Sequence, residues 1–109
     1  MERHPVRKAD GTVVAHVSGE ILYKKVKPEL HMLRNPPAWA FDRTTIDQAK
    51  TLGATAIILI DDKTGRRWGI TIKRFDDLYF EVNRGHGEQI AVALPAWQIF
   101  EPGVLTFNV

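Results

Sequence analysis

The pattern of hydrophobic and polar positions is most informative over residues 44–73. Apolar residues recur there at helical spacing, as expected for the buried stripe of a short helix: Ile46, Ala49 and Leu52. Thr45 and Gln48 have capping-box spacing at its start, and Thr44 offers an alternative cap one residue earlier. Gly53 is suited to end the helix, because glycine adopts a positive φ without a Cβ clash.

A continuous apolar run, Ala54–Ile60, follows this helix. The run is rich in β-branched residues and too short to span a membrane, so it predicts a strand that is covered on both faces. Asp61–Arg66 has the composition of a turn. Alternation of apolar with small or polar residues over Trp68–Lys73 then predicts a half-buried strand, antiparallel to the first.

Short alternating runs predict strands elsewhere in the chain as well. A hairpin is expected over Thr12–Val17 and Glu20–Val26, joined at Ser18–Gly19. The remaining expected elements are strands over Leu78–Val82, Ile90–Leu94 and Val104–Val109, and a turn over Phe75–Asp77. Lys27–Phe41 contains three prolines among many apolar residues, so we expect an ordered connection lying on the core, with one helical turn over Pro28–Leu33.

Together these elements predict an α+β fold, with a mostly antiparallel β-sheet of about seven short strands and one main α-helix packed on one face. Residues 1–109 are assigned to a single domain, with residues 1–9 as a candidate flexible N-terminal segment. The chain has no cysteine, and its N-terminus lacks the apolar core of a signal peptide. We therefore expect a cytoplasmic protein that does not interact with a membrane.

Charge is distributed unevenly along a chain whose formal net charge is only +2. Residues 1–34 carry seven Lys or Arg against four Asp or Glu, and residues 63–86 carry six against three. If these two basic segments meet in space, they form a patch for phosphates or for an acidic protein surface. The alternative is a set of scattered, solvated cations.

The residues that serve in metal sites and in nucleophilic catalysis lack the required spacing. No HxH, HxxxH or HExxH pair occurs among the histidines, which are His4, His16, His31 and His86. We therefore expect no metal and no cofactor. Ser18 is the only serine, and no nucleophile elbow surrounds it. The loop Gly85–Gly87 does not lead from a buried strand into a helix, so a hairpin turn is favoured over a phosphate-binding loop.

One arrangement of residues 44–73 suggests catalysis. The expected order is helix, apolar strand, Asp61, turn, and a strand ending in Lys73, which resembles the core of the PD-(D/E)XK nuclease family. The resemblance implies an Mg²⁺-dependent nuclease in which Asp61 holds the metal and Lys73 helps to activate a water. The family's second acid, two positions before the lysine, is replaced by Thr71. An enzyme is therefore the alternative to a non-catalytic protein.

Aromatic residues between cations on predicted strands favour a small non-catalytic binding module. Tyr23 and Tyr79 are the candidate stacking residues for bases, whereas Trp68 is expected to face the core. The candidate residues for binding nucleic acid or another anionic partner are Lys24, Lys25, Lys27, Arg66, Arg67, Lys73, Arg74 and Arg84. Compact, cysteine-free domains of this kind are found among accessory proteins, including those of phage and mobile elements.

A third hypothesis is a protein-interaction subunit. Trp39 and Phe41 provide an apolar anchor if they are exposed, since aromatic residues dominate interface hot spots. The expected strand Val104–Val109 could extend the sheet of a partner. The sequence leaves open whether Trp39 and Trp68 lie in the core or on the surface.

Overall fold

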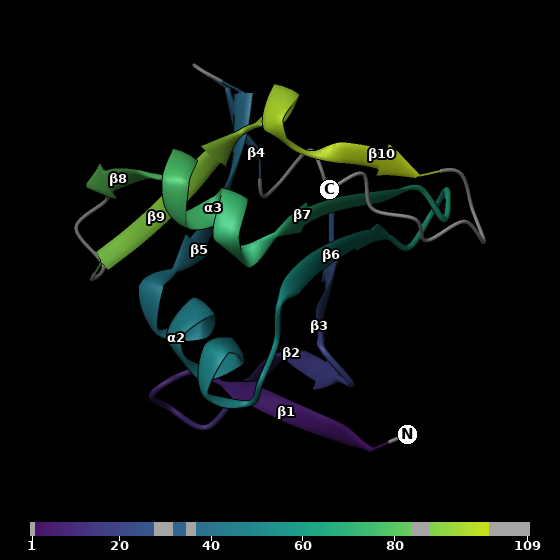
Figure 1. Cartoon of the computed structure of the whole chain (residues 1–109), viewed down its shortest axis with the longest axis vertical. Helices are drawn as coiled ribbons and strands as arrows, with labels where there is room; N and C mark the ends of the chain where they lie inside the picture. The colour runs from purple at the N-terminus through teal and green to yellow at the C-terminus, as the bar shows by residue number, and fades with distance from the viewer. Residues whose placement is uncertain (1, 28–31, 35–36, 84–87, 101–109) are drawn as a thin grey trace.

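The computed structural model describes residues 2–27, 32–34, 37–83 and 88–100 (Figure 1). The larger sheet has six strands in the order β1 (Arg3–Arg7), β2 (Val13–Ser18), β3 (Ile21–Val26), β6 (Ala56–Asp61), β7 (Arg67–Thr71) and β10 (Gln98–Phe100). The smaller sheet has four in the order β4 (Met32–Arg34), β5 (Pro37–Asp42), β9 (Glu88–Ala93) and β8 (Phe80–Asn83). Among the described residues, the helices are α2 (Arg43–Thr51), α3 (Ile72–Leu78) and the 3₁₀ turn η1 (Leu94–Ala96).

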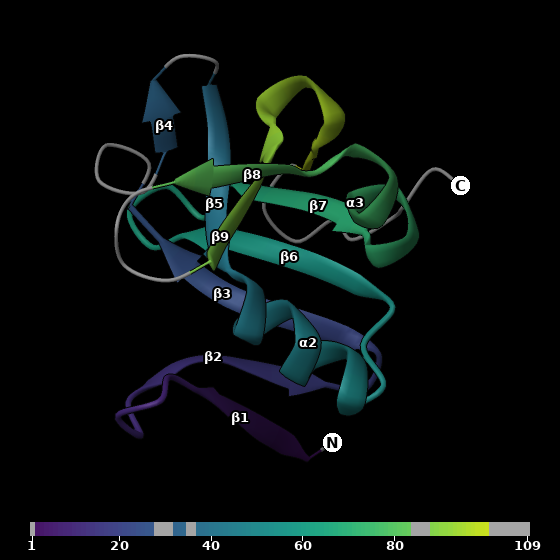
Figure 2. The same ribbon diagram turned by 90° about the vertical axis from the view of Figure 1, so that its left-hand side faces the viewer.

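The two sheets form two layers, and the smaller sheet lies with both α-helices on one face of the larger one (Figures 1 and 2). Strands β3 and β6 run parallel, whereas the other paired strands of both sheets are antiparallel. The predicted α+β fold, with a largely antiparallel sheet and one main helix on one face, is confirmed. Neither described α-helix has the length and apolar character needed to cross a membrane.

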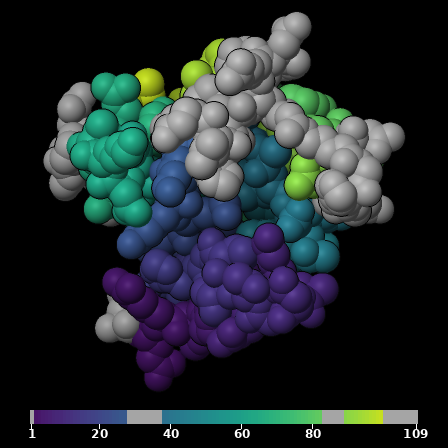
Figure 3. All heavy atoms as spheres, turned by 180° about the vertical axis from the view of Figure 1, so that it is seen from behind, coloured from purple at the N-terminus to yellow at the C-terminus, as the bar shows by residue number. Residues whose placement is uncertain are grey.

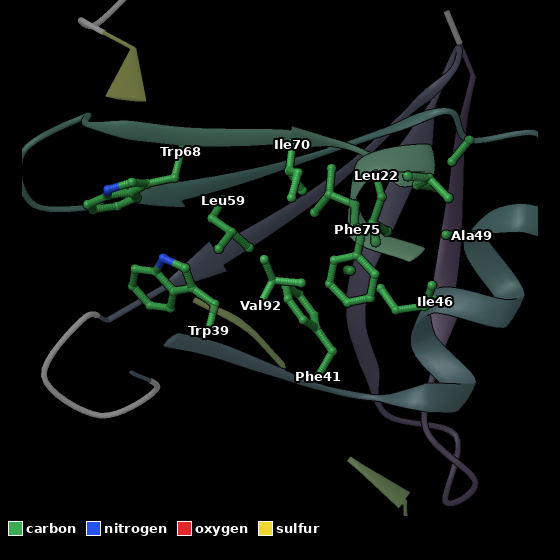
Figure 4. Close-up of a cluster of buried hydrophobic side chains, with 14 of the residues drawn as sticks. Leu22, Trp39, Phe41, Ile46, Ala49, Leu59, Trp68, Ile70, Phe75 and Val92 are labelled. Atoms are coloured by element: carbon green, nitrogen blue, oxygen red, sulfur yellow. The ribbon is translucent and has the colours of Figure 1, made fainter. Parts of the chain in front are cut away.

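The hydrophobic core fills the space between the two layers (Figure 4). Phe75 of α3 is fully buried, with ring centroids 5.8 Å from Phe41 and 6.5 Å from Trp97. At the other end of the core, the rings of Trp39 and Trp68 lie 5.2 Å apart and join β5 to β7. Burial of these large aromatic side chains accounts for much of the apolar area that stabilises the fold.

Helix α2 confirms the expected element and corrects its start. The helix begins at Arg43, and its N-cap Asp42 makes no side-chain capping bond, so the capping box of Thr45 and Gln48 does not form. Thr45 is instead buried at 5% exposure, within the first turn of the helix. Gly53 follows the helix with a φ of 88° and donates its amide to the carbonyl of Lys50, as expected of a glycine at this position.

The central strands match the expectation closely. Strand β6 is buried on both faces, because four consecutive side chains, from Ala56 to Leu59, are all at most 6% exposed. Strand β7 pairs with it antiparallel, with Leu59 opposite Trp68. The predicted N-terminal hairpin is also present as β2 and β3, with Ser18 opposite Ile21 across a turn where Gly19 has a φ of 60°.

Helix α3 is the largest departure from the expected elements. The expected strand Trp68–Lys73 ends at Thr71, and residues 72–78 form a helix in place of a strand end and a turn. The Thr71 side chain accepts a hydrogen bond from the amide of Arg74 at 3.2 Å and so caps the helix. Ile72 and Phe75, three residues apart, bury the same side of this helix in the core.

Further strands occur where the sequence indicated no regular element. Arg3–Arg7, within the segment considered as a flexible terminus, forms β1 and pairs with β2, and its Val6 is fully buried. Strands β4 and β5 form a hairpin within the segment expected to be an irregular connection, and Met32 and Leu33 lie in β4 where a helical turn was expected. The expected strand Val104–Val109 lies outside the described residues.

Candidate functional site

The larger sheet has an outer face, directed away from the smaller sheet. Strand register places cross-strand neighbours in rows on this face because side chains alternate along each strand. One row contains His16 opposite Tyr23. The next contains Lys25 opposite Ile60, which in turn is opposite Arg67. Residues from β2, β3, β6 and β7 that are distant in sequence are thus brought together.

A groove of about 810 Å³ is hollowed into this face and is called the outer-face groove here. Its lining includes Arg3, His16, Tyr23, Lys25, Ile60 and Arg67. Figure 3, which shows the molecule from behind, has residues of β2 and β3 in purple and blue at the surface, next to the teal residues of the turn after β6. The groove thus combines two aromatic rings with aliphatic residues such as Ile60 and with four cationic residues, since Lys24 also contributes to its lining.

The aromatic rings of the groove form one stacked pair. The ring centroids of His16 and Tyr23 are 5.6 Å apart, and the ring planes are inclined by 21°. Both side chains are half-buried. The pair is held by the β2–β3 register, so it is a fixed feature of the hairpin.

The imidazole of His16 lies in an environment that disfavours its charge. Burial is the largest cause that lowers the pKa of His16 below 6.5, and the positive charges of Arg3 and Lys25 lower it further. The ring is therefore neutral at pH 7 and stacks on Tyr23 as a neutral heterocycle. The two cations named here face the same ring and set a positive potential around it.

The cations at the far end of the groove are accessible. Lys25 is exposed, and its Nζ lies 3.8 Å from a carboxylate oxygen of Asp62, which is also exposed. An ion pair of this exposure contributes little to stability and exchanges readily for another anion. Arg66 and Lys27, both exposed, lie at the same end of the sheet as the turn between β6 and β7. Arg67 is half-buried and lines the groove directly.

Lys24 differs from its neighbours in β3. Strand alternation directs its side chain to the core side, as for Leu22 and Val26, which are buried. Burial is the main cause that lowers the pKa of Lys24, and the charge of Asp42 opposes this effect. Lys24 is therefore less suited to phosphate binding than Lys25, although the sequence ranked the two together.

The nuclease geometry is not formed. Asp61 lies at the end of the hairpin where β6 turns into β7, whereas Lys73 lies in α3, beyond the opposite end, where Ala56 faces Thr71. The carboxylate of Asp61 accepts hydrogen bonds from the Lys63 amide at 2.9 Å and the Thr64 hydroxyl at 3.0 Å. These bonds lower the pKa of Asp61 and build a turn. The resemblance failed because α3 replaces the strand end that it required.

The remaining predicted site residues lie away from the groove. Tyr79 follows α3 on the core side, stacked 6.2 Å from Phe75, with the Arg43 guanidinium 5.4 Å from its ring centroid. Arg74 is exposed on α3 together with Lys73. Arg84 and the Gly85–Gly87 loop lie outside the described residues.

The apolar anchor proposed for a protein partner is part of the core. Trp39 is 1% exposed and Phe41 is 4% exposed. Trp68, at 6%, is buried beside Trp39. No indole or phenyl ring at these three positions is available to a partner.

Among the charged and aromatic residues of the groove, Arg3 and His16 were not predicted as binding residues from the sequence. The signal for His16 was the tight turn at Gly19, because a hairpin closed there places His16 opposite Tyr23. Arg3 had no comparable signal, since its place depends on the pairing of β1 with β2.

Neither a metal-binding cluster nor a similarity to known proteins indicates a function for the described part of the chain. Within the described parts of the chain, no three His, Asp or Glu side chains gather closely enough to hold a metal ion. Comparison with known proteins gave no match to a protein-family model, to a curated protein or to a solved structure.

Proposed function

We propose that this protein is a small non-catalytic binding module that contacts nucleic acid through the outer-face groove. The observation that carries the proposal is the stacked pair of His16 and Tyr23, set between Arg3 on one side and Lys25 and Arg67 on the other. Aromatic rings flanked by cations on a sheet face are the means by which many domains bind bases and phosphates together.

The electrostatic arrangement supports nucleic acid over an acidic protein surface. Nucleic acid carries planar bases and phosphates at regular intervals, and the groove offers both a stacked ring pair for a base and cations for phosphates. Lys25 and Arg67 share one row of the sheet, so a phosphate chain crossing that row meets both. The cations come from β1, β3 and β7, and the two basic segments of the sequence therefore contribute to one surface.

The proposal is tested by fluorescence anisotropy with labelled oligonucleotides at low salt. The double variant Lys25→Glu/Arg67→Glu removes two groove cations, and Lys73→Glu/Arg74→Glu makes the same change of net charge on α3. We expect the groove variant to lose binding and to show a weaker salt dependence by about one unit of slope per lost phosphate contact. The α3 variant should retain most of the affinity.

Three results would contradict the proposal. The wild-type protein binds no oligonucleotide at low salt; both double variants lose affinity equally; or poly-glutamate competes as effectively as nucleic acid of equal charge. The last outcome would favour an acidic protein as the partner. Circular dichroism of both variants confirms that each is folded before binding is compared.

A further inference from the structure

We infer that the outer-face groove binds single-stranded nucleic acid, with an unpaired base placed against the ring pair of Tyr23 and His16 and with phosphates at Arg3, Lys25 and Arg67. This inference rests on the proposed function and specifies its ligand. It is carried by the position of the rings within the groove and of the cations around them.

The shape of the surface excludes the usual means of reading a duplex. Proteins read duplex DNA by inserting a protruding helix or β-ribbon into the major groove. The groove here is a hollow in a sheet face, and its rings are half-buried within it. The bases of a duplex are stacked on one another inside the helix, so they cannot reach Tyr23 without unpairing.

An unpaired base, by contrast, meets suitable chemistry in the groove. Tyr23 and the neutral His16 present π surfaces, and Ile60 adds an aliphatic contact. Stacking of bases on aromatic rings is tolerant of sequence because every base has a π face. The groove therefore predicts a preference for single strands with little preference among sequences.

The cations are spaced along the strands on either side of the ring pair. Arg3 lies opposite Ser18, one row before the row of His16 and Tyr23. Lys25 and Arg67 lie together in the row that follows the ring pair. Successive rows on one face are about 7 Å apart. A strand that crosses these rows passes the rings between its first and last phosphate contacts, and three contacts predict a salt slope of about −2.

The experiment compares three probes of equal length by fluorescence anisotropy: a mixed-sequence single strand, its duplex, and a single strand of abasic sites. Wild-type protein should bind the base-bearing single strand at least about tenfold more tightly than the abasic strand, because stacking is lost in the latter. Tyr23→Ala should lower affinity for the base-bearing strand to near that for the abasic strand. Tyr23→Phe, which keeps the ring, should bind as the wild type does.

The outcomes separate this inference from the proposed function. If the duplex binds as tightly as the single strand, or if Tyr23→Ala weakens both single-stranded probes equally, the single-strand inference is wrong while nucleic-acid binding stands. If none of the three probes binds at low salt, both are wrong. Because Tyr23 is half-buried at the surface, Tyr23→Ala is expected to remain folded. Tyr23→Phe removes only the hydroxyl, so its affinity shows whether the ring or the hydroxyl is needed.

Discussion

Gln48 is the side chain that attaches the edge strand β1 to helix α2. Its Oε1 accepts the amide of Arg7 at 3.1 Å, and its Nε2 donates to the carbonyl of Arg7 at 2.6 Å. The side-chain amide thus satisfies the backbone groups of an edge residue as a neighbouring strand would. Pro5, in the same strand, has no amide to offer, so both residues limit pairing of β1 with another chain.

Replacing Gln48 by Ala should therefore destabilise the protein by about 1–2 kcal/mol, because two hydrogen bonds to the backbone are lost. Urea denaturation measures the change. Thr44→Ala, at an exposed position of the same helix, is the matched control and should change stability by less than about 0.5 kcal/mol. Equal effects of the two substitutions would show that Gln48 does not attach β1.

His16 makes stability depend on pH with a definite sign. Its pKa in the folded protein lies below the value of 6.5 in the unfolded chain, since burial and the charges of Arg3 and Lys25 disfavour the imidazolium. Between these two values the unfolded state binds more protons, so the free energy of unfolding falls as the pH falls through this range.

The pH effect is measured by denaturation of the wild type and His16→Gln between about pH 8 and pH 5, the range in which histidine titrates. The wild type should lose more stability on acidification than the variant, which lacks the titrating group. A loss in the variant that equals or exceeds the loss in the wild type would refute the assigned direction of the shift.

At the scale of elements, the hairpins set the groove and the short helix α3 closes the core. The β2–β3 register creates the ring pair, and the β6–β7 register brings Arg67 into line with Lys25 through Ile60. Helix α3 carries Phe75 to the centre of the core, where it contacts rings from β5 and from the segment after η1. The groove thus depends on strand pairing, and the interior depends on α3.

The start of α3 is fixed by Thr71, and this can be tested with two substitutions. Thr71→Val keeps the β-branched shape that suits the end of β7 but removes the hydroxyl that accepts the Arg74 amide, so it should cost about 1 kcal/mol. Thr71→Ser retains the cap and should cost less. Thermal or urea unfolding compares them, and a serine variant less stable than the valine variant would argue against capping.

The sequence predicted elements with a strong local signal and missed those that depend on distant partners. The apolar run predicted β6, and the glycine after α2 predicted the end of that helix, because both signals depend only on neighbouring residues. Strands β1 and β5 have weak local patterns and form because partners in β2 and β9 pair with them. Helix α3 was missed because Ile72, its first apolar position, continues the alternation of Trp68 and Ile70 in the preceding strand.

The same division applies to the candidate site. Tyr23, Lys25 and Arg67 were predicted from their residue types and strand positions, and the structure places all three in one groove. Lys73 and Arg74 were included with them because the sequence predicted a strand up to Lys73, but the structure has helix α3 there, away from the groove. Residue type therefore indicated the chemistry, but only the cross-strand register showed which residues share a surface.

At the scale of the whole molecule, the two faces of the larger sheet differ in what they contact. One face is covered by the smaller sheet and the helices and supplies the core. The outer face carries the groove, with rings and cations drawn from β1, β2, β3 and β7. This separation allows the groove residues to change with little effect on the core, so binding and stability can be tested independently.

The most direct test of the central claim is a nuclear magnetic resonance titration of isotope-labelled protein with an unlabelled single-stranded oligonucleotide at low salt. Our account predicts that the largest amide shifts occur in β2, β3, β6 and β7, centred on Tyr23, His16 and Lys25, with small changes over α3. Saturating shifts centred on α3, or the absence of any shift at low salt, would contradict it.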